Sequence, residues 1–374
     1  MNLDLFFATN RNHLGNNRWA PEGYGTKFSS DGHYNLRFGK LSIKASNEKI
    51  NSFLAESFTE GTGNGESLSS YLAKEMGKAK IMAYQDKTSE KEVSFEHNSS
   101  TRMFLDVKSR MEKSMDVLIF IHGYNVSWTN AAASALALQL MLNKDKKAGE
   151  QKTMVLLFSW PSDGSMMPFA AYKSDRSDAR DSAQAVGRGL LKLRDFLAKL
   201  NSKEDTPQKW QPCNQKIHLL CHSMGNYVLQ NALTKLEGYA MGNKMSRIFD
   251  NIFLCAADVD DDVLEKDGKM GRLHEITSHL SVYYNNEDVA LHISDYTKSN
   301  PQRLGHTGSA RPQLIHNKIH QIDCTPIVRG LVEHSYYLWA TVNEDIAMTI
   351  QGIAFDDPER RRKRLANSRE WKMT

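Results

Sequence analysis

The chain has 374 residues, of which 40% are hydrophobic and 25% charged, and its formal net charge at pH 7 is +4. This composition is ordinary for a soluble globular protein, and no window approaches the roughly 18 apolar residues of a membrane-spanning helix. A net charge this small does not by itself indicate nucleic-acid binding, so we expect no nucleic-acid partner.

The N-terminus and the cysteines predict a cytoplasmic protein. Residues 1–7 have no basic region, and their apolar run is too short for a signal peptide. Three of the four cysteines lie in apolar, strand-like segments, where free cysteine behaves as a small hydrophobic residue. No pair of cysteines has the spacing of metal ligands, and we expect neither a metal nor another cofactor.

The first hundred residues predict two strands followed by an insertion. Residues 3–9 are rich in strand-forming side chains, and residues 34–43 alternate between apolar and polar positions. Residues 44–101 are polar, with several glycines near the middle, which predicts an irregular insertion that could form a cap. Within it we expect a short helix at residues 67–76 and a strand at residues 79–84.

From residue 116 onward, apolar runs alternate with helical patterns. The runs predict strands that are buried on both faces of a parallel sheet, at residues 116–122, 154–160, 217–221, 252–257, 280–285 and 319–323. The flanking segments predict helices at residues 103–115, 129–142, 182–200, 227–236, 263–274 and 332–340. Parallel strands must be joined by crossovers, so we predict an α/β fold, with a mostly parallel central sheet and helices on both faces.

Residues 216–230 are the stretch around which the chain is organised. Their pattern indicates a strand, a sharp turn and a helix, with Ser223 at the turn. A serine in this position is a nucleophile elbow, because its hydroxyl stands clear of both elements. Glycine usually lies on both sides of the serine; here Gly225 keeps the second position and Cys221 replaces the first. Since a serine between small residues also occurs in ordinary turns, it is the flanking strand and helix that favour the nucleophile.

Ligands of such sheets bind at the carboxyl ends of the strands, so the residues that follow each strand are functional candidates. The first regular strand is followed by His122 and Gly123. A tight turn at the glycine could bring the N–H of Tyr124 or a neighbour towards the serine. With the N–H of Met224 it would form an oxyanion hole. The alternative is a strand-end glycine beside a histidine of the core.

A nucleophilic serine needs a histidine base and an acid that orients the histidine, in the chain order serine, acid, histidine. Two acids follow strands downstream of the serine. We favour Asp288, which lies on the strand that most often supplies the acid, and Asp258 is the alternative. His334, beyond the last strand, is the favoured base. Other histidines fit surface, core or supporting positions better, namely His122, His222, His292, His306, His316 and His320.

The one basic cluster lies near the C-terminus, at Arg360–Arg364, directly after several acidic residues. This charge pattern predicts a solvated helical tail over residues 356–374, following a single domain of residues 1–355. Binding of nucleic acid or of an anionic membrane through the cluster is the alternative.

Taken together, the motifs resemble bacterial α/β-hydrolases that are esterase-like or lipase-like and of uncharacterised function. The resemblance covers about residues 3–340 and rests on residues 7–11 (FATNR), 121–125 (IHGYN), 158–162 (FSWPS), 222–226 (HSMGN), 258–260 (DVD) and 334–337 (HSYY). It implies an α/β-hydrolase fold and a serine hydrolase with Ser223 as the nucleophile. The sequence departs from the family at Cys221 and in the long insertion, which leaves the substrate open because caps set specificity in this fold.

The motifs thus predict hydrolysis of a carboxylic ester, with a small-molecule or lipid acyl group, through an acyl-enzyme intermediate. Amides, thioesters and phospholipids are cleaved by the same machinery and remain alternative substrates. A non-catalytic interaction module on the same fold is an alternative from another class. The complete set of serine, acid and histidine argues against it, since a binding protein does not need all three.

Overall fold

The computed structural model describes residues 1–86, 97–147, 149–162, 168–200, 212–238, 245–291, 302–328, 333–365 and 368–374. The strands of its main sheet are β1 (Asn2–Thr9), β4 (Arg37–Lys44), β7 (Lys80–Ala83), β8 (Met115–Ile121), β9 (Lys152–Ser159), β10 (Ile217–His222), β11 (Phe249–Cys255), β12 (Thr277–Tyr284), β13 (Ile319–Asp323), β14 (Arg362–Arg364) and β15 (Glu370–Met373). Two small hairpins are formed by β2 (Arg11–Leu14) with β3 (Gly23–Phe28), and by β5 (Ser57–Phe58) with β6 (Gly61–Thr62).

The main sheet is eleven-stranded, with the order β14-β15-β13-β12-β11-β10-β8-β9-β1-β4-β7. Every neighbouring pair from β15 to β1 is parallel. The antiparallel pairs lie at the edges, where β14 joins β15 and where β4 joins β1 and β7. The predicted α/β fold with a mostly parallel sheet is confirmed, and β10, which carries the elbow, lies near the middle.

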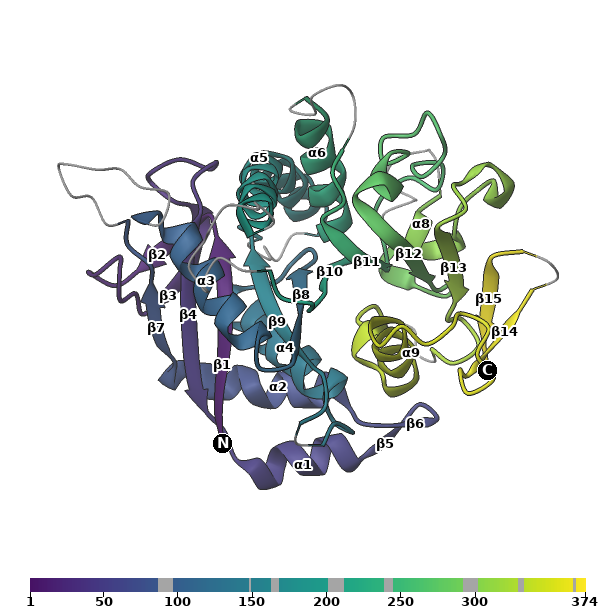
Figure 1. Cartoon of the computed structure of the whole chain (residues 1–374), viewed down its shortest axis with the longest axis horizontal. Coiled ribbons are helices and arrows are strands. Elements are labelled where there is room, and N and C mark those ends of the chain that lie inside the picture. The colour runs from purple at the N-terminus through teal and green to yellow at the C-terminus, as the bar shows by residue number, and fades with distance from the viewer. Residues whose placement is uncertain are drawn as a thin grey trace.

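Helices cover both faces of the sheet, and each face has its own hydrophobic core (Figure 1). One face packs against α3 (Ser99–Met111), α5 (Pro168–Leu200) and α6 (Gly225–Gly238). The other packs against α1 (Asn47–Ala55), α2 (Gly65–Glu75), α4 (Trp128–Leu142) and α9 (Ala340–Ile350). Successive side chains of a strand point to opposite faces, so Val117 and Ile121 belong to the first core, and Leu118 and Phe120 to the second. The described residues also contain short helical turns, namely α8 (Leu304–Thr307), η1 (Met76–Lys78), η5 (Leu273–Ile276), η6 (Pro312–Leu314) and η7 (Tyr336–Leu338).

The structure corrects the expectation that residues 44–101 are irregular. The described part of this segment contains α1, α2 and β7, and β7 pairs with β4 at the edge of the main sheet. The helix predicted at residues 67–76 and the strand at 79–84 are confirmed as α2 and β7. Only a narrow stripe of α2 is apolar and buried, including Leu68 and Leu72. Most residues of α2 are polar, which is why the sequence pattern around it predicts an irregular segment.

The expected helical tail is also wrong. Residues 362–364 form β14, which pairs with β15, and β15 extends the sheet beyond β13. Arg360 and Arg362 are buried, whereas Arg361 and Lys363 are exposed, as expected for chain in which alternate side chains point inward. Both buried guanidinium groups contact the carboxylate of Asp345, at 2.8 and 2.7 Å. Because every residue of the run is basic, the sequence does not reveal which of its side chains are buried.

Of the helices predicted in the second half of the chain, the one at residues 263–274 is wrong and the one at residues 332–340 starts later than expected. Residues 263–274 form successive turns that lead into η5. A Cβ at Gly268 would lie 2.5 Å from the backbone oxygen of Val263, so the chain folds back on itself there. The helix predicted at residues 332–340 starts later, because α9 begins at Ala340 and the preceding turn is η7. Residue 332 lies outside the described residues.

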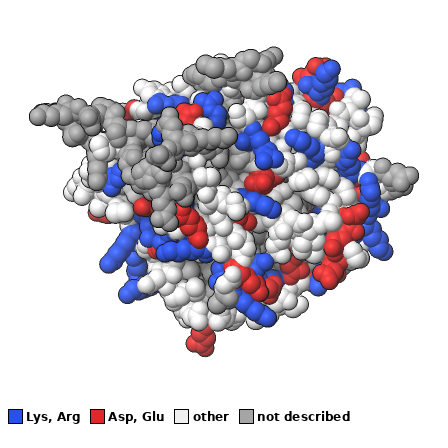
Figure 2. Space-filling model, in the orientation of Figure 1, with Lys and Arg blue, Asp and Glu red and all other residues white. Residues whose placement is uncertain are grey.

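The surface bears charges of both signs. On the face shown in Figure 2, lysine and arginine side chains are interspersed with aspartate and glutamate. This mixture agrees with the small net charge of the sequence. Within the described ranges, the structure has no helix whose length and apolar character would allow it to cross a membrane.

Candidate active site

Ser223 lies at the carboxyl end of β10, in a backbone conformation that is rare for its residue type. Its φ angle is +52°, in the left-handed region, and the residue is only 5% exposed. The Ser223 N–H donates to the backbone oxygen of Cys255 at 3.0 Å, and the Asp258 N–H donates to the oxygen of Ser223 at 3.2 Å. These bonds hold the sharp turn in place, as a nucleophile elbow requires.

Two glycines allow the elbow to pack closely against the loop after β8. A Cβ at Gly225 would lie 2.6 Å from the backbone oxygen of Ile121, so the start of α6 can approach β8 only without a side chain there. A Cβ at Gly123 would lie 2.7 Å from the Cβ of Ser223. Cys221, which replaces the first glycine of the elbow pattern, is fully buried in the core. The turn therefore tolerates a small side chain at that position.

The loop after β8 carries Tyr124, the predicted second oxyanion donor. The N–H of Asn125 donates to the carboxylate of Asp175 at 3.2 Å, and that carboxylate also accepts from the hydroxyl of Ser162 at 2.5 Å. The N–H of Val126 donates to the Ser162 hydroxyl at 3.2 Å. These contacts fix the loop beside the elbow. No motif in the sequence predicts this role for Asp175.

A buried arginine supports the same loop from the N-terminal strand region. Arg11 is fully buried; its guanidinium donates to the Val126 oxygen at 2.7 Å and to the Ser159 hydroxyl at 2.9 Å. His122 packs against this group and stacks on Trp160, whose backbone N–H donates to His122 Nε2 at 3.2 Å. Burial, reinforced by the charge of Arg11, lowers the pKa of His122 to about 3. His122 is therefore neutral at physiological pH and supports the loop.

Met224, the other predicted oxyanion donor, directly precedes the first residue of α6. The first N–H groups of a helix have no acceptor within it, and the helix dipole gives this end a partial positive charge. The N–H of Met224 thus belongs to a group of donors suited to an oxyanion.

The buried carboxylate of Asp288 contacts the partly buried imidazole of His334. Asp288 follows β12 and is 1% exposed, and its Oδ2 lies 2.7 Å from His334 Nδ1. Its Oδ1 accepts the N–H of Leu291 at 3.1 Å. The His334 side chain is 20% exposed. An ionised Asp288 therefore favours the tautomer with the proton on Nδ1, which leaves Nε2 as the basic nitrogen.

His222 holds the His334 segment against the elbow. Its Nε2–H donates to the backbone oxygen of His334 at 3.1 Å, and the two imidazole rings lie 4.8 Å apart between centroids. Burial lowers the pKa of His222 well below its ordinary value, and the neighbouring His334 acts in the same direction. Farther along, the Tyr336 hydroxyl donates to the oxygen of Tyr283 at 2.9 Å. Since His222 directly precedes Ser223, these contacts bring the histidine segment to the nucleophile.

Asp258, the alternative acid, has other partners. It is 2% exposed and follows β11, beside the elbow. Its Oδ2 accepts from the Tyr172 hydroxyl at 2.8 Å, and its Oδ1 lies 3.3 Å from Nε of Arg303. Arg303 is itself fully buried and also pairs with Asp260. The carboxylate of Asp258 therefore faces a permanent cation.

The remaining candidate histidines lie elsewhere or are not described. His306 contacts the backbone oxygen of Asn286, His316 stacks on His274, and His320 stacks on Phe355. His292 lies outside the described residues. Among the residues that the structure places, no group of three or more histidine, cysteine or acidic side chains could hold a metal ion.

Comparison with known families matches residues 96–347 to the family of alpha/beta hydrolases of unknown function called DUF900. The chain belongs to this family. The matched region includes Ser223, Asp288 and His334, whereas Arg11 lies before it. The suspected relationship to an uncharacterised α/β-hydrolase family is thus confirmed.

Comparison with curated proteins gives no match. Among solved structures, the chain is similar to an inhibited esterase B from Lactobacillus rhamnosis, with 12% identity, a TM-score of 0.35 and coverage of 64% of this chain and 78% of that one. It is also similar to the phospholipase PlaB from Legionella pneumophila, with 14% identity, a TM-score of 0.20 and coverage of 52% and 43%.

Proposed function

We propose that the protein is a serine hydrolase that cleaves a carboxylic ester through an acyl-enzyme intermediate. Its membership in an α/β-hydrolase family supports the hydrolase class. The observation that carries the proposal is the contact of 2.7 Å between Asp288 and His334 Nδ1, on a segment that His222 holds beside the strained Ser223. An acid, an imidazole and an elbow serine are the three groups that make an alcohol nucleophilic.

In the proposed reaction, the Ser223 hydroxyl attacks the ester carbonyl carbon while Nε2 of His334 accepts its proton. The tetrahedral oxyanion binds the N–H groups of Met224 and Tyr124. The imidazolium then gives its proton to the departing alcohol, and the acyl group remains on Ser223. A water molecule, deprotonated by His334, hydrolyses the acyl-enzyme and restores the serine. Asp288 keeps the imidazole in the required tautomer and stabilises its charged form.

Two nearby histidines are poor candidates for the base, which strengthens the assignment of His334. Burial lowers the pKa of both His122 and His222. Both rings are also occupied by structural contacts, with Trp160 and with the His334 backbone respectively. Neither ring can exchange a proton readily near neutral pH.

The experiment combines a fluorophosphonate probe with nitrophenyl esters of graded acyl length. We expect the probe to label the wild type and the control variant Ser52→Ala, which changes an exposed serine of α1, and not to label Ser223→Ala. Ester turnover should follow the same pattern. Equal labelling of Ser223→Ala and the wild type would contradict the proposal.

Amide, thioester and phospholipid analogues in the same assay would rank the alternative substrates. We expect the highest kcat/KM for carboxylic esters of small molecules or lipids. A folded wild-type protein that turns over none of these compounds would instead favour the non-catalytic interaction module.

A further inference from the structure

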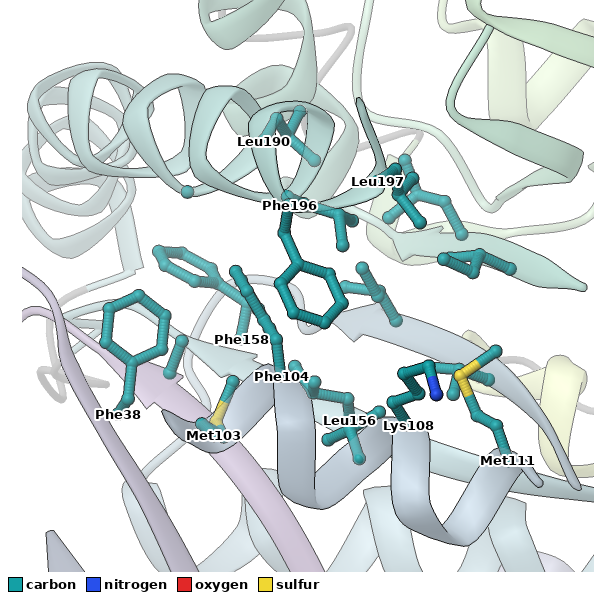
Figure 3. Close-up of a pocket in the computed structure, with 18 of the residues that line it drawn as sticks. Phe38, Met103, Phe104, Lys108, Met111, Leu156, Phe158, Leu190, Phe196 and Leu197 are labelled. Carbon is teal, nitrogen blue, oxygen red and sulfur yellow. The ribbon is translucent and has the colours of Figure 1, made fainter. Parts of the chain in front are cut away.

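An apolar cavity lies inside the molecule, between the sheet and the helices α3 and α5. Its volume is about 160 Å³, and its walls include Phe38, Phe104, Leu156, Phe158 and Phe196. Figure 3 shows side chains of α3 pointing towards those of α5 across this space. Protein interiors rarely leave voids much larger than a water molecule. An apolar cavity of about 150 Å³ is known to bind benzene, so this volume is sufficient for a small apolar ligand.

The cavity opens at the amino ends of the parallel strands, where some of its lining residues are exposed to solvent. Ile119 lies in the middle of β8, between β9 and β10, and yet is only partly buried, because it lines the cavity. The lining residues before β10 include Pro212, which is exposed, and Cys213 and Gln215, which are partly exposed. Ser223 lies at the opposite end of β10, roughly 20 Å away along the strand. The opening is therefore separate from the candidate active site.

A cation lies in the wall of this cavity. Lys108 is on the buried face of α3, with Phe104 and Met111 on either side at helical spacing, where an apolar residue would be expected. It is only 3% exposed, and Figure 3 shows its amine among apolar side chains. Lys108 pairs with Glu112, whose side chain is 46% exposed. An ammonium group has three donors, so this single pairing does not exhaust its hydrogen-bonding capacity.

The position of Lys108 gives the cavity a polar end. The chain passes from the C-terminal end of α3 to the first residues of β8. Lys108 and Met111 therefore lie towards the amino ends of the strands, where the cavity opens. Phe38 and Phe158 line the cavity farther along the strands. A ligand that matches this arrangement has an anionic head near the opening and an apolar chain directed inward.

We propose that the cavity binds a free medium-chain fatty acid, with its carboxylate on Lys108 and its acyl chain along the sheet. A carboxylate and an ammonium form a charge-assisted hydrogen bond, which is strong in a site that excludes water. The volume suits a chain of about six to eight carbons. The methionines Met103 and Met111 in the wall can adjust to such a chain, because their side chains are unbranched and flexible.

Gly189 provides further support for a cavity that is kept open. It lies inside α5 and lines the cavity, although glycine destabilises a helix interior relative to alanine. A Cβ at this position would meet only a side-chain atom of Leu36, at 3.1 Å. A larger residue would therefore project into the cavity without a backbone clash, which makes Gly189 a suitable position for closing it.

The experiment measures octanoate binding by isothermal titration calorimetry in the Ser223→Ala background, where the proposed catalysis cannot interfere. We expect one saturable site. Lys108→Met should weaken octanoate binding at least about tenfold, while octan-1-ol, which lacks the charge, should bind both proteins alike. The matched control Lys113→Met, which changes an exposed lysine just beyond α3, should leave octanoate affinity unchanged.

Two further variants test the proposal even if Lys108→Met does not fold. Glu112→Gln removes the competing carboxylate from a partly exposed position, and should strengthen octanoate binding severalfold. Gly189→Leu should fill the cavity and abolish the binding of both octanoate and octan-1-ol. The proposal is overturned if octanoate shows no saturable binding, if folded Lys108→Met binds it as tightly as the parent, or if Gly189→Leu leaves the affinity unchanged. Failure of esterase activity would leave this result unaffected, since binding is measured without the nucleophile.

Discussion

Asp258 and Asp288 occupy equivalent places on neighbouring strands and yet have different surroundings. Both are buried carboxylates at the carboxyl ends of parallel strands, β11 and β12. Asp258 contacts Tyr172 and the guanidinium of Arg303, whereas Asp288 contacts the imidazole of His334. Arginine stays charged throughout the accessible pH range, while histidine can gain and lose a proton near neutrality.

This difference shows that an acid at a strand end is defined by its partner. A carboxylate facing arginine forms a fixed ion pair, which holds two loops together. A carboxylate facing histidine can stabilise a proton that moves during a reaction. The following predictions test whether the two acids divide in this way between stability and catalysis.

The largest expected effect is the loss of activity on changing Asp288 to asparagine. Asparagine preserves the shape of the side chain but no longer favours the required imidazole tautomer, so kcat for ester hydrolysis should fall about 10³–10⁴-fold. Asp258→Asn, assayed in parallel on the same nitrophenyl esters, should retain kcat within about tenfold of the wild type. A larger loss in Asp258→Asn than in Asp288→Asn would reverse the assignment of the acid.

The next effect is on stability, and it falls on the other acid. Arg303→Met leaves the buried carboxylate of Asp258 without its cation, and should lower the free energy of unfolding by about 3–5 kcal/mol in urea titrations. The control Arg194→Met breaks an exposed ion pair with Asp195 and should cost about 0–1 kcal/mol. Equal losses of unfolding free energy in the two variants would show that the buried ion pair stabilises the protein no more than the exposed one.

Glu66 of α2, which lies near Glu333 on the segment that carries His334, should make the stability of the protein depend on pH. Burial, reinforced by the nearby Glu333, raises the pKa of Glu66 from 4.5 to about 7. The folded protein then holds a proton that the unfolded chain has lost, so this contribution to stability is complete below about pH 4.5 and disappears as the pH rises to about 7.

Glu66→Gln should remove this part of the pH dependence. The variant should be more stable than the wild type at pH 8, by on the order of 2 kcal/mol, with a smaller difference at pH 5. Urea unfolding at four pH values between 5 and 8 would measure it. The exposed Glu48→Gln serves as the control and should follow the wild type. Parallel stability curves for Glu66→Gln and the wild type would disprove the coupling.

The smallest predicted effect concerns the Tyr172 hydroxyl, which donates a hydrogen bond to Asp258. Tyr172→Phe removes one neutral donor from a carboxylate that keeps its arginine, so the free energy of unfolding should fall by about 1 kcal/mol. Ester turnover should change by no more than a few fold. Tyr34→Phe, at an exposed tyrosine, is the matched control. A loss of activity comparable to that of Asp288→Asn would place Asp258 in the reaction.

The central sheet was predictable from the sequence because its strands are buried on both faces and appear as continuous apolar runs. The elements outside it were harder to predict, since their stability depends on distant partners. The buried arginines of β14 and the segment before it face Asp345 of α9, and no local pattern reveals that contact. The turns around Gly268 likewise depend on close backbone packing.

The candidate site divides in the same way. Ser223, Asp288 and His334 could be proposed because each follows or precedes a recognisable element in the order that the fold requires. Their catalytic roles remain predictions. Arg11 and Asp175 were not assigned their supporting roles, because they act on the Tyr124 loop from positions that are remote in sequence. In the sequence, Arg11 stands out only as part of the family motif at residues 7–11.

The hairpin of β14 and β15 affects how truncations of this protein should be interpreted. The last residue, Thr374, donates its N–H to the oxygen of Arg361, and Asp345 has both Arg360 and Arg362 as partners. Removing residues 356–374 would leave a buried anion without its cations and would expose the edge of β13. Any binding or activity lost by such a shortened protein would therefore report damage to its architecture, and a reporter fused at this end needs a linker that leaves the hairpin intact.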